Sequence, residues 1–372
     1  MLANCCSSLS FQILIPTLPV YLQYYGHSET VVGFVVGILV LTTILFRPII
    51  GNITDRWNKK YLFVIGLLII MLSVFSYQFT MLVMPLIFIR LLHGVGWGIV
   101  TTAANTLAID SIPKTRMGEG LGYYGLSSVF SMAVAPAIGL YIIQWGFRLL
   151  FITASVLALL GIIFAICITY HRTGSEDAIT KKIKLAELFE RRAIKPSLIN
   201  FFISLTFSSI TTYITLYAIE LGVDHIGVFF MIFSITLFMV RPLTGRMVDQ
   251  RGYHYVILPG IILIGIGILI LIFSKSMIYF IAAAVLYGIG LGAVQPSLQT
   301  MLAFHAPSSR YGAANSTFLL SSDLGFGIGA MVWGKAVDVT SYSMMYSFVL
   351  IPTFLAFAFQ LFNMKNRNQL KK

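Results

Sequence analysis

Long apolar segments recur from one end of this chain to the other, and they leave it few folds other than a bundle of membrane-spanning helices. A helix needs about 20 apolar residues to cross roughly 30 Å of hydrocarbon, where it also satisfies its own backbone hydrogen bonds. Only 10% of the 372 residues are charged, against about 25% in soluble domains. The predicted fold class is therefore an all-α polytopic membrane protein. Twelve transmembrane helices are predicted, at residues 2–24, 30–50, 61–78, 83–109, 118–142, 147–169, 197–221, 226–247, 255–274, 277–304, 310–333 and 344–364.

The formal net charge of +12 comes from basic residues that gather in alternate loops. With both termini in the cytoplasm, 19 Lys and Arg residues fall in inner loops and tails, whereas Arg148, Lys275 and Lys335 fall outside. The positive-inside rule describes this asymmetry. The basicity therefore indicates a topology with both termini cytoplasmic, and no nucleic-acid partner is expected.

One long inner connection divides the predicted spans into six and six. Apolar residues lie along one side of residues 178–193 within it, so this stretch is either an amphipathic helix on the inner membrane surface or a solvated linker. The expected domains are an N-terminal six-helix bundle at 1–170, a cytoplasmic linker at 171–196, and a C-terminal six-helix bundle with a short tail at 197–372.

An internal repeat relates the two halves at a constant offset of 194 residues. Three pairs of segments align at this offset: Arg47–Asp55 with Arg241–Asp249, His93–Gly98 with Tyr287–Gly292, and Arg116–Gly118 with Arg310–Gly312. Two parallel repeats of six spans, related by an axis along the membrane normal, are one known design of secondary transporters. The repeat therefore predicts two pseudo-symmetric halves.

The chain begins at the edge of an apolar segment, with no charged residue before it. A cleaved signal peptide is not expected, because no small-residue cleavage site interrupts this segment. We expect that a short cytoplasmic tail is missing from this start, or that a downstream start codon was used.

No enzyme chemistry and no cofactor are expected from the motifs. Cys5, Cys6 and Cys167 are scattered through the spans, which gives no disulfide framework and no metal-ligand spacing. The sequence has no G-x-x-x-x-G-K-[ST] loop, H-E-x-x-H or G-x-S-x-G element, each of which would carry a known chemistry. The glycines of residues 288–292 lie within an apolar span and indicate helix packing instead of a dinucleotide loop.

Motifs after the second and eighth spans resemble those of the major facilitator superfamily, and the resemblance covers essentially the whole chain. Residues 51–60, GNITDRWNKK, resemble the loop 2–3 signature G-x-L-x-D-R-x-G-R-K, from which they depart at Asn58 and Lys59. Residues 245–252 are similar to the weaker second copy. The resemblance implies the two-half fold of that superfamily and an inner gate. The implied gate residues are Gly51, Asp55, Arg56, Lys59, Asp110, Gly245, Asp249 and Arg251.

Two physical expectations follow for this gate. The signature glycine is expected to allow a close approach of neighbouring helices. Asp110 is expected to form one charge cluster with Asp55 and Arg56 at the inner end of the bundle.

Three further features resemble the drug–proton antiporter branch of the superfamily. Residues 16–19 are similar to its P-x-x-P element, and in residues 90–98 an intramembrane arginine precedes a G-x-G, as in its fourth-span motif. Residues 135–140, with Pro136 and Gly139, are similar to the antiporter signature G-P-x-x-G-G with two glycines replaced. The resemblance therefore implies export coupled to protons.

Charged residues inside spans are expensive and are therefore functional candidates. Asp323 lies near the middle of its predicted span, so we expect it either to face a cavity and carry a proton or to support helix packing. Arg90 lies about 10 Å inside the outer end of its span, and its repeat mate is Ala284; it serves a proton path or substrate electrostatics, or it snorkels. His93 titrates near neutral pH when unperturbed, but its repeat mate Tyr287 favours packing or hydrogen bonding.

These features predict a secondary transporter that exports small organic or amphipathic molecules by alternating access, in exchange for protons. The alternatives are a proton symporter or facilitated-diffusion importer, a non-transporting sensor or scaffold that uses the basic linker, and a lipid flippase. The expected partners are a small-molecule substrate, protons and the lipid bilayer, and the expected state is a monomer. The expected location is a bacterial plasma membrane.

Overall fold

A computed structural model describes residues 1–80, 82–112, 117–170, 190–306 and 311–369 of the chain. Within these helices, the side chains at 48, 52, 55, 56, 117–123, 311, 312 and 365–369 are outside the description. The linker at 171–189, with most of the stretch for which an amphipathic helix was considered, also lies outside the described residues.

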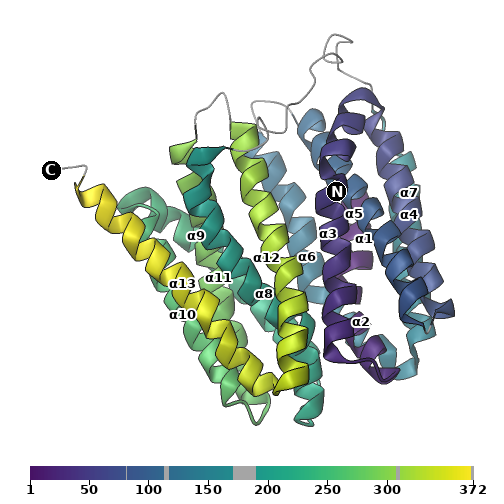
Figure 1. Cartoon of the computed structure of the whole chain (residues 1–372). Coiled ribbons are helices and arrows are strands. Elements are labelled where there is room, and N and C mark those ends of the chain that lie inside the picture. The colour runs from purple at the N-terminus through teal and green to yellow at the C-terminus, as the bar shows by residue number, and fades with distance from the viewer. Residues whose placement is uncertain (81, 113–116, 171–189, 307–310, 370–372) are drawn as a thin grey trace. The chain divides into compact units, whose positions relative to one another are not determined.

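The described residues are helical almost throughout and contain no strand (Figure 1). The α-helices are α1 (Leu2–Gln12), α2 (Leu14–Tyr24), α3 (Glu29–Arg56), α4 (Lys59–Ser76), α5 (Val83–Ser111), α6 (Met117–Ile142), α7 (Phe147–Ile166), α8 (Ile194–Glu220), α9 (Gly227–Arg251), α10 (His254–Ile272), α11 (Met277–His305), α12 (Tyr311–Val339) and α13 (Tyr342–Gln369). Short 3₁₀ helices are η1 (Tyr77–Phe79), η3 (Ile143–Trp145) and η6 (Arg191–Ala193). The predicted all-α membrane fold is confirmed.

Each predicted span has a helical counterpart among the described residues, although the boundaries move by a few residues. Within the described part of the chain, eleven segments are long and apolar enough to cross a membrane, and α1 with α2 counts as one of them. The remaining long helix, α12, has 29 residues; it carries Asp323 within its predicted span, and Lys335 and Asp338 near its end beyond that span. Ionisable side chains inside a span are rare, so α12 is a candidate for a functional role in addition to crossing the membrane.

The first predicted span is broken into α1 and α2 at Ile13. Pro16 has no N–H to continue the hydrogen-bond ladder to residue 12, which accounts for a break at this point. The Thr17 hydroxyl donates to the Ile13 carbonyl at 2.7 Å, across the first turn after the break. The P-x-x-P element is visible in the sequence, but the prediction for residues 2–24 was one continuous helix, and the structure has two.

The chain divides into two compact units. The first unit comprises Met1–His27 and Ile38–Lys182, and the second comprises Ser28–Gly37 and Ile183–Lys372. The first turns of α3 therefore pack with the second unit, although they belong to the N-terminal half of the sequence.

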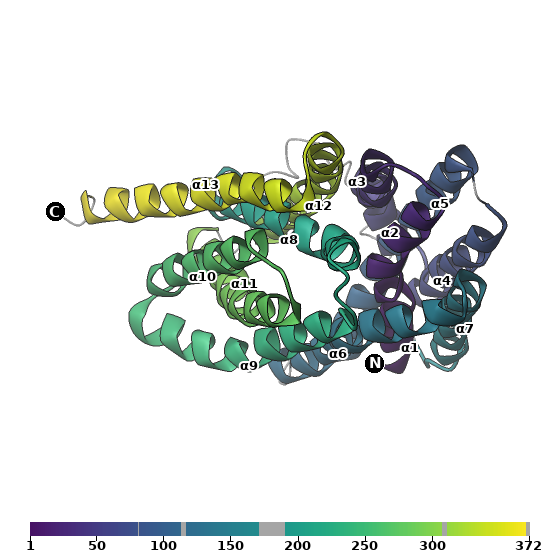
Figure 2. The same ribbon diagram turned by 90° about the horizontal axis from the view of Figure 1, so that it is seen from below.

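Glycine contacts show that the repeat in the sequence is also a repeat in packing. In the first unit, a methyl group built on Gly96 of α5 would lie 3.1 Å from the Gly66 carbonyl of α4. In the second unit, a methyl group on Gly290 of α11 would lie 2.6 Å from the Gly260 carbonyl of α10. Gly66 and Gly96 each lie 194 residues before their counterparts, Gly260 and Gly290, so the same helix crossing occurs once in each unit. In Figure 2, α10 and α11 lie side by side.

We use two names below for the ends of the helices. The predicted inner end is the one where α3 ends and α4 begins, around residues 56–59, and the predicted outer end is the one where α2 ends and α7 begins, around residues 24 and 147.

Candidate transport and gating site

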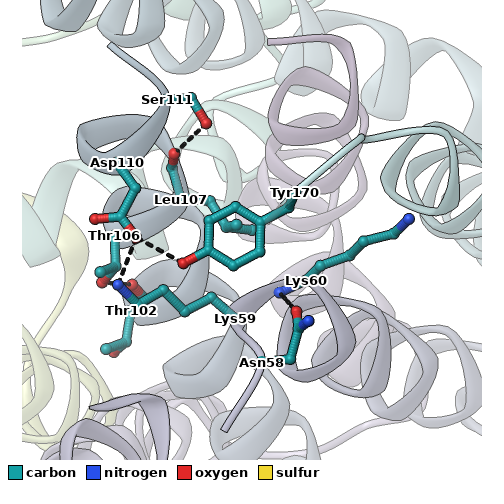
Figure 3. Close-up of polar contacts among 9 residues, drawn as sticks. All are labelled: Asn58, Lys59, Lys60, Thr102, Thr106, Leu107, Asp110, Ser111 and Tyr170. Atoms are coloured by element: carbon teal, nitrogen blue, oxygen red, sulfur yellow. Dashed lines mark hydrogen bonds and ion pairs between the residues drawn. The ribbon is translucent and has the colours of Figure 1, made fainter. Parts of the chain in front are cut away.

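A cluster at the predicted inner end joins α4 to α5 in the first unit. Lys59 is the first residue of α4, and its position is set by Asn58, whose side-chain oxygen accepts from the Lys60 backbone N–H at 3.0 Å. The Lys59 ammonium lies 2.5 Å from the Asp110 carboxylate near the end of α5. The Tyr170 hydroxyl donates to the same Asp110 oxygen at 2.7 Å. Figure 3 shows both groups converging on Asp110; we call Lys59, Asp110 and Tyr170 the inner latch.

The inner latch agrees only in part with the expected charge cluster. Asp110 is in it, but its ionic partner in the structure is Lys59. The side chains of Asp55 and Arg56 lie outside the described residues, so their expected pairing stays a prediction. Tyr170 was missed, because nothing in its local sequence distinguishes it from the other tyrosines at span ends.

Among the described residues, no neighbour approaches the signature glycines closely, so the expected close approach there stays a prediction. A methyl group built on Gly51 or Gly245 would meet nothing within 4 Å. Both glycines lie inside helices, in the last turns of α3 and α9, and not in a loop. Asp249 and Arg251 also belong to α9 and are exposed.

Arg90 and His93 lie on α5 and share a partner. His93 is 0% exposed, and its Nδ1 shares a 2.8 Å hydrogen bond with the hydroxyl of Tyr77 in η1. Its other ring nitrogen, Nε2, has no hydrogen-bond partner among the described residues. Arg90 is 6% exposed and interacts with the same Tyr77 hydroxyl. The structure therefore brings these two predicted residues together around a tyrosine that the sequence did not single out.

An aromatic pair adjoins this group in the first unit. The rings of Phe11 in α1 and Trp97 in α5 are stacked, with centroids 3.8 Å apart and an angle of 9° between planes. The edge of Phe11 also meets His93, with centroids 5.9 Å apart. Both rings of the pair are partly exposed, so the pair offers an apolar face next to the buried polar group.

Asp323 is the thirteenth of the 29 residues of α12 and is partly exposed. It directly follows two serines that bind α8: Ser321 accepts from the Asn200 amide at 3.3 Å, and Ser322 shares a 3.0 Å bond with Ser204. A polar seam thus runs between α12 and α8 at the depth of Asp323. Such a seam gives a carboxylate inside the bundle polar surroundings.

The antiporter-like positions of α6 pack against the break in the first span. A methyl group on Gly139 would lie 2.8 Å from the Ile13 carbonyl, and Pro136 lies one turn earlier inside α6. Only a glycine permits this approach, because any side chain would strike backbone. The motif therefore has a packing reason here: it seats α6 on the α1–α2 break.

A second cluster, which the sequence did not predict, lies at the predicted outer end within the second unit. The Asp338 carboxylate of α12 accepts from the backbone N–H groups of Glu29 at 2.9 Å and Thr30 at 2.8 Å, and from the Thr30 hydroxyl. The Tyr342 hydroxyl of α13 donates to the Glu29 carboxylate at 2.6 Å. We call these four residues the outer clasp.

The outer clasp holds the first turn of α3 on α12. A methyl group on Gly33 would lie 2.1 Å from the Ala330 carbonyl, so the two backbones touch one turn below the clasp. Asp338 supplies the N-terminal cap of α3 from another helix. Nothing in the sequence marks the two acids of the outer clasp, Glu29 and Asp338, apart from their positions near the ends of predicted spans.

Comparisons with known proteins agree with this architecture. The model of the family described as Major Facilitator Superfamily matches residues 1–330 and 221–371 of the chain. The chain is 25% identical to the multi-drug resistance efflux pump PmrA of Streptococcus pneumoniae, over 97% of this chain and 93% of that protein. It is also 25% identical to the staphylopine export protein of Staphylococcus aureus, over 88% and 87%. The crystal structure of a nucleoside transporter, NupG, matches with a TM-score of 0.80 at 13% identity, over 97% of this chain and 98% of that one.

Proposed function

The chain belongs to the Major Facilitator Superfamily, and on that premise we propose that it exports small organic or amphipathic molecules in exchange for protons. That it is a multi-pass membrane transporter follows from the family and the helices. The direction, the substrate class and the proton coupling are the parts proposed.

The observation that carries proton coupling is the partly exposed carboxylate of Asp323 in the middle of α12. An acid at this depth is costly to keep ionised in an apolar environment, so its presence favours a role in binding a proton or a charged substrate. The serines beside it hold α12 on α8, which keeps the carboxylate in place while it gains and loses a proton.

The inner latch supports alternating access. Lys59, Asp110 and Tyr170 are joined by two short polar contacts, and the Lys59 and Asp110 side chains are each 19% exposed. A partly exposed ion pair contributes on the order of 1 kcal/mol or less. A contact of this size can form and break during a transport cycle without trapping the protein in one state.

Export is favoured over import by the curated relatives that match over most of the chain. One is named a multi-drug resistance efflux pump and the other an export protein. The Phe11–Trp97 pair, with its partly exposed stacked rings, offers a surface for apolar or aromatic parts of a substrate. Arg90 and His93 are buried polar groups on the same helix as Trp97, next to this pair.

The test is transport by the purified protein in liposomes with an imposed pH gradient. A panel of cationic, neutral and anionic aromatic compounds is offered, with ethidium as the cationic member. We expect gradient-driven movement of at least one compound, reduced at least tenfold in Asp323→Asn. Asp224→Asn is the matched control, because it makes the same change at an exposed position of the second unit, between α8 and α9.

Equal loss in both variants would contradict a coupling role for Asp323. Transport that persists without a pH gradient in the unaltered protein would contradict proton exchange and favour facilitated diffusion.

We also propose that the protein acts as a monomer in a bacterial plasma membrane with both termini in the cytoplasm. The distribution of basic residues in the sequence supports this orientation. A cysteine added at either terminus should react with a membrane-impermeant maleimide only after the cells are opened. Labelling of intact cells would contradict the orientation.

A further inference from the structure

A cavity of about 540 Å³ opens at the predicted outer end of the first unit, between the end of α2, the η1 turn and the start of α7. Its volume is within the range of about 300–1,000 Å³ that is usual for small-molecule sites. The lining is mostly aromatic, with one cation, Arg148, and the amides of Gln78 and Gln144. The aromatic residues are Tyr21, Tyr24, Tyr25, Trp145, Phe147 and Phe151.

The back of this cavity is rigid. Tyr21 and Phe151 are buried, and their rings meet edge to face with centroids 5.1 Å apart. The Tyr21 hydroxyl donates to the Thr80 carbonyl at 2.7 Å, which ties α2 to the chain just after η1. Phe147 completes the wall, 5.1 Å from Tyr21 between centroids. The cavity is therefore preformed instead of being a gap between mobile side chains.

The rim, in contrast, is exposed. Tyr24 is 72% exposed and Trp145 is 61% exposed. Gly146 between Trp145 and Phe147 has φ of +112°, which L side chains rarely adopt. This turn lets the residues on both sides of it line the same cavity.

Arg148 is the one charged side chain among the described residues that line the cavity, and no Asp or Glu is among them. Neither residues 1–28 nor residues 57–109 nor residues 120–170 contain a single Asp or Glu in the sequence. Arg148 lies in the first turn of α7, where no side chain caps the helix among the described residues. The backbone N–H groups and the dipole at that helix end add to the attraction for an anion. A ligand that fits this charge carries a negative group.

The position of the cavity indicates which kind of anion binds there. Tyr24, Trp145 and Phe147 are the terminal residues of three apolar segments that are long enough to cross a membrane. Exposed Trp and Tyr side chains at such ends lie at the level of the lipid headgroups. A ligand there therefore has an anionic head at Arg148 and an apolar body against the rings and the bilayer.

We propose that this cavity is a binding site for the headgroup of an anionic phospholipid, with the phosphate at Arg148 and the glycerol and upper acyl region against Trp145 and Tyr24. Arginine is suited to phosphate because its guanidinium donates two parallel hydrogen bonds. The cavity is lined by neither Asp323 nor a residue of the inner latch, so the proposal stands or falls independently of the proposed transport activity.

The test uses the full-length protein in mild detergent, titrated with dihexanoyl-phosphatidylglycerol while tryptophan fluorescence is recorded. Subtracting the signal of Trp145→Phe isolates the reporter at the cavity. We expect a saturable change in the unaltered protein and an affinity at least tenfold weaker in Arg148→Gln. Arg148→Lys keeps the charge but not the paired donors, so an intermediate affinity is expected.

Two controls make the result specific. Lys275→Gln removes a basic residue predicted at the same membrane face but outside this cavity, and it should bind as the unaltered protein does. Dihexanoyl-phosphatidylcholine has the same phosphate and chains but carries cationic choline in place of the headgroup glycerol, and we expect its affinity to be at least tenfold weaker.

Three results would overturn the proposal. The first is equal affinity of Arg148→Gln and the unaltered protein for phosphatidylglycerol. The second is equal binding of the two lipids. The third is tighter binding of soluble toluenesulfonate than of phosphatidylglycerol, which would assign the cavity to a soluble aromatic anion.

Discussion

Single polar contacts hold the ends of α3, α4 and α5 in place, although each contact contributes little free energy. In the inner latch, Asp110 accepts from both Lys59 and Tyr170. In the outer clasp, Asp338 accepts from the first turn of α3. Hydrogen bonds to charged groups contribute about 1.5–3 kcal/mol when buried and less when exposed. These contacts therefore shift conformational equilibria but do not hold the protein in one conformation.

Tyr170→Phe is predicted to weaken the inner latch slightly while leaving the Lys59–Asp110 ion pair in place. Loss of one hydrogen bond to a partly exposed carboxylate costs about 1 kcal/mol, which shifts a conformational equilibrium by about fivefold. Asp110→Asn should shift it further, because both contacts weaken together. The measurement is the rate of maleimide labelling of a cysteine placed at Ser111, in a background without native cysteines. Unchanged labelling in both variants would contradict the latch.

Asp338→Asn is predicted to destabilise the protein equally at pH 8 and pH 5. Desolvation raises the pKa of Asp338, but the hydrogen bonds from the Thr30 hydroxyl and from the backbone of Thr30 and Glu29 lower it, and the net pKa lies below its usual 3.8. A lowered pKa means that the contribution is present above the unfolded value and is lost only as pH falls through the lower folded value.

The expected cost of this substitution is about 1 kcal/mol, as for other helix caps, because Asp338 is exposed. Thermal unfolding in detergent from pH 5 to pH 8 measures it. Lys335→Gln, one turn earlier on the exposed side of α12, is the control with no capping contact. A penalty that disappears at pH 5 would show that Asp338 titrates in that range, contrary to the expectation.

At the scale of helices, close crossings at glycine repeat in both units, and they explain why α4 and α5 form the same pair as α10 and α11. Gly290→Ala is predicted to destabilise the second unit by roughly 1–3 kcal/mol, because its methyl group would lie 2.6 Å from the Gly260 carbonyl and overpacking has costs of this size. Gly245→Ala should be neutral or stabilising by up to about 1 kcal/mol, since it lies in a helix with open space around it. Thermal unfolding of the two variants separates these outcomes, and equal unfolding temperatures would contradict the crossing.

At the scale of the whole molecule, α3 belongs to both units, with Ser28–Gly37 in the second and the rest in the first. A chain cut within residues 171–189 is therefore predicted to regain function when both pieces are co-expressed. In the N-terminal piece alone, a cysteine at Val35 should react rapidly with maleimide, because its packing partners are missing; in the co-expressed pair it should react at least tenfold more slowly, since Val35 is 0% exposed. Equal rates would show that these turns do not depend on the second unit.

Much of the architecture could be predicted because it depends on composition and period. Apolar segments of about 20 residues, the charge bias between loops and the 194-residue repeat led to the spans and the two-half fold, and both the fold class and the family are confirmed. Candidate residues also followed where a charge lies inside an apolar segment, as with Asp323 and Arg90. These signals are local in the sequence, so no knowledge of helix rotation is needed to see them.

Only the tertiary structure decided which side chains meet. Tyr170 lies 60 residues from Asp110, and Tyr342 lies 313 residues from Glu29; such pairings depend on how each helix is rotated and shifted along its axis. A helix that is apolar on every side has no polar stripe to set its rotation, so its sequence does not encode its partners. The break at Ile13, the passage of α3 into the second unit and the aromatic cavity around Arg148 all depend on packing between distant segments. The amino-acid sequence by itself determined that the chain crosses a membrane in two repeated halves; the packing determined where its chemistry lies.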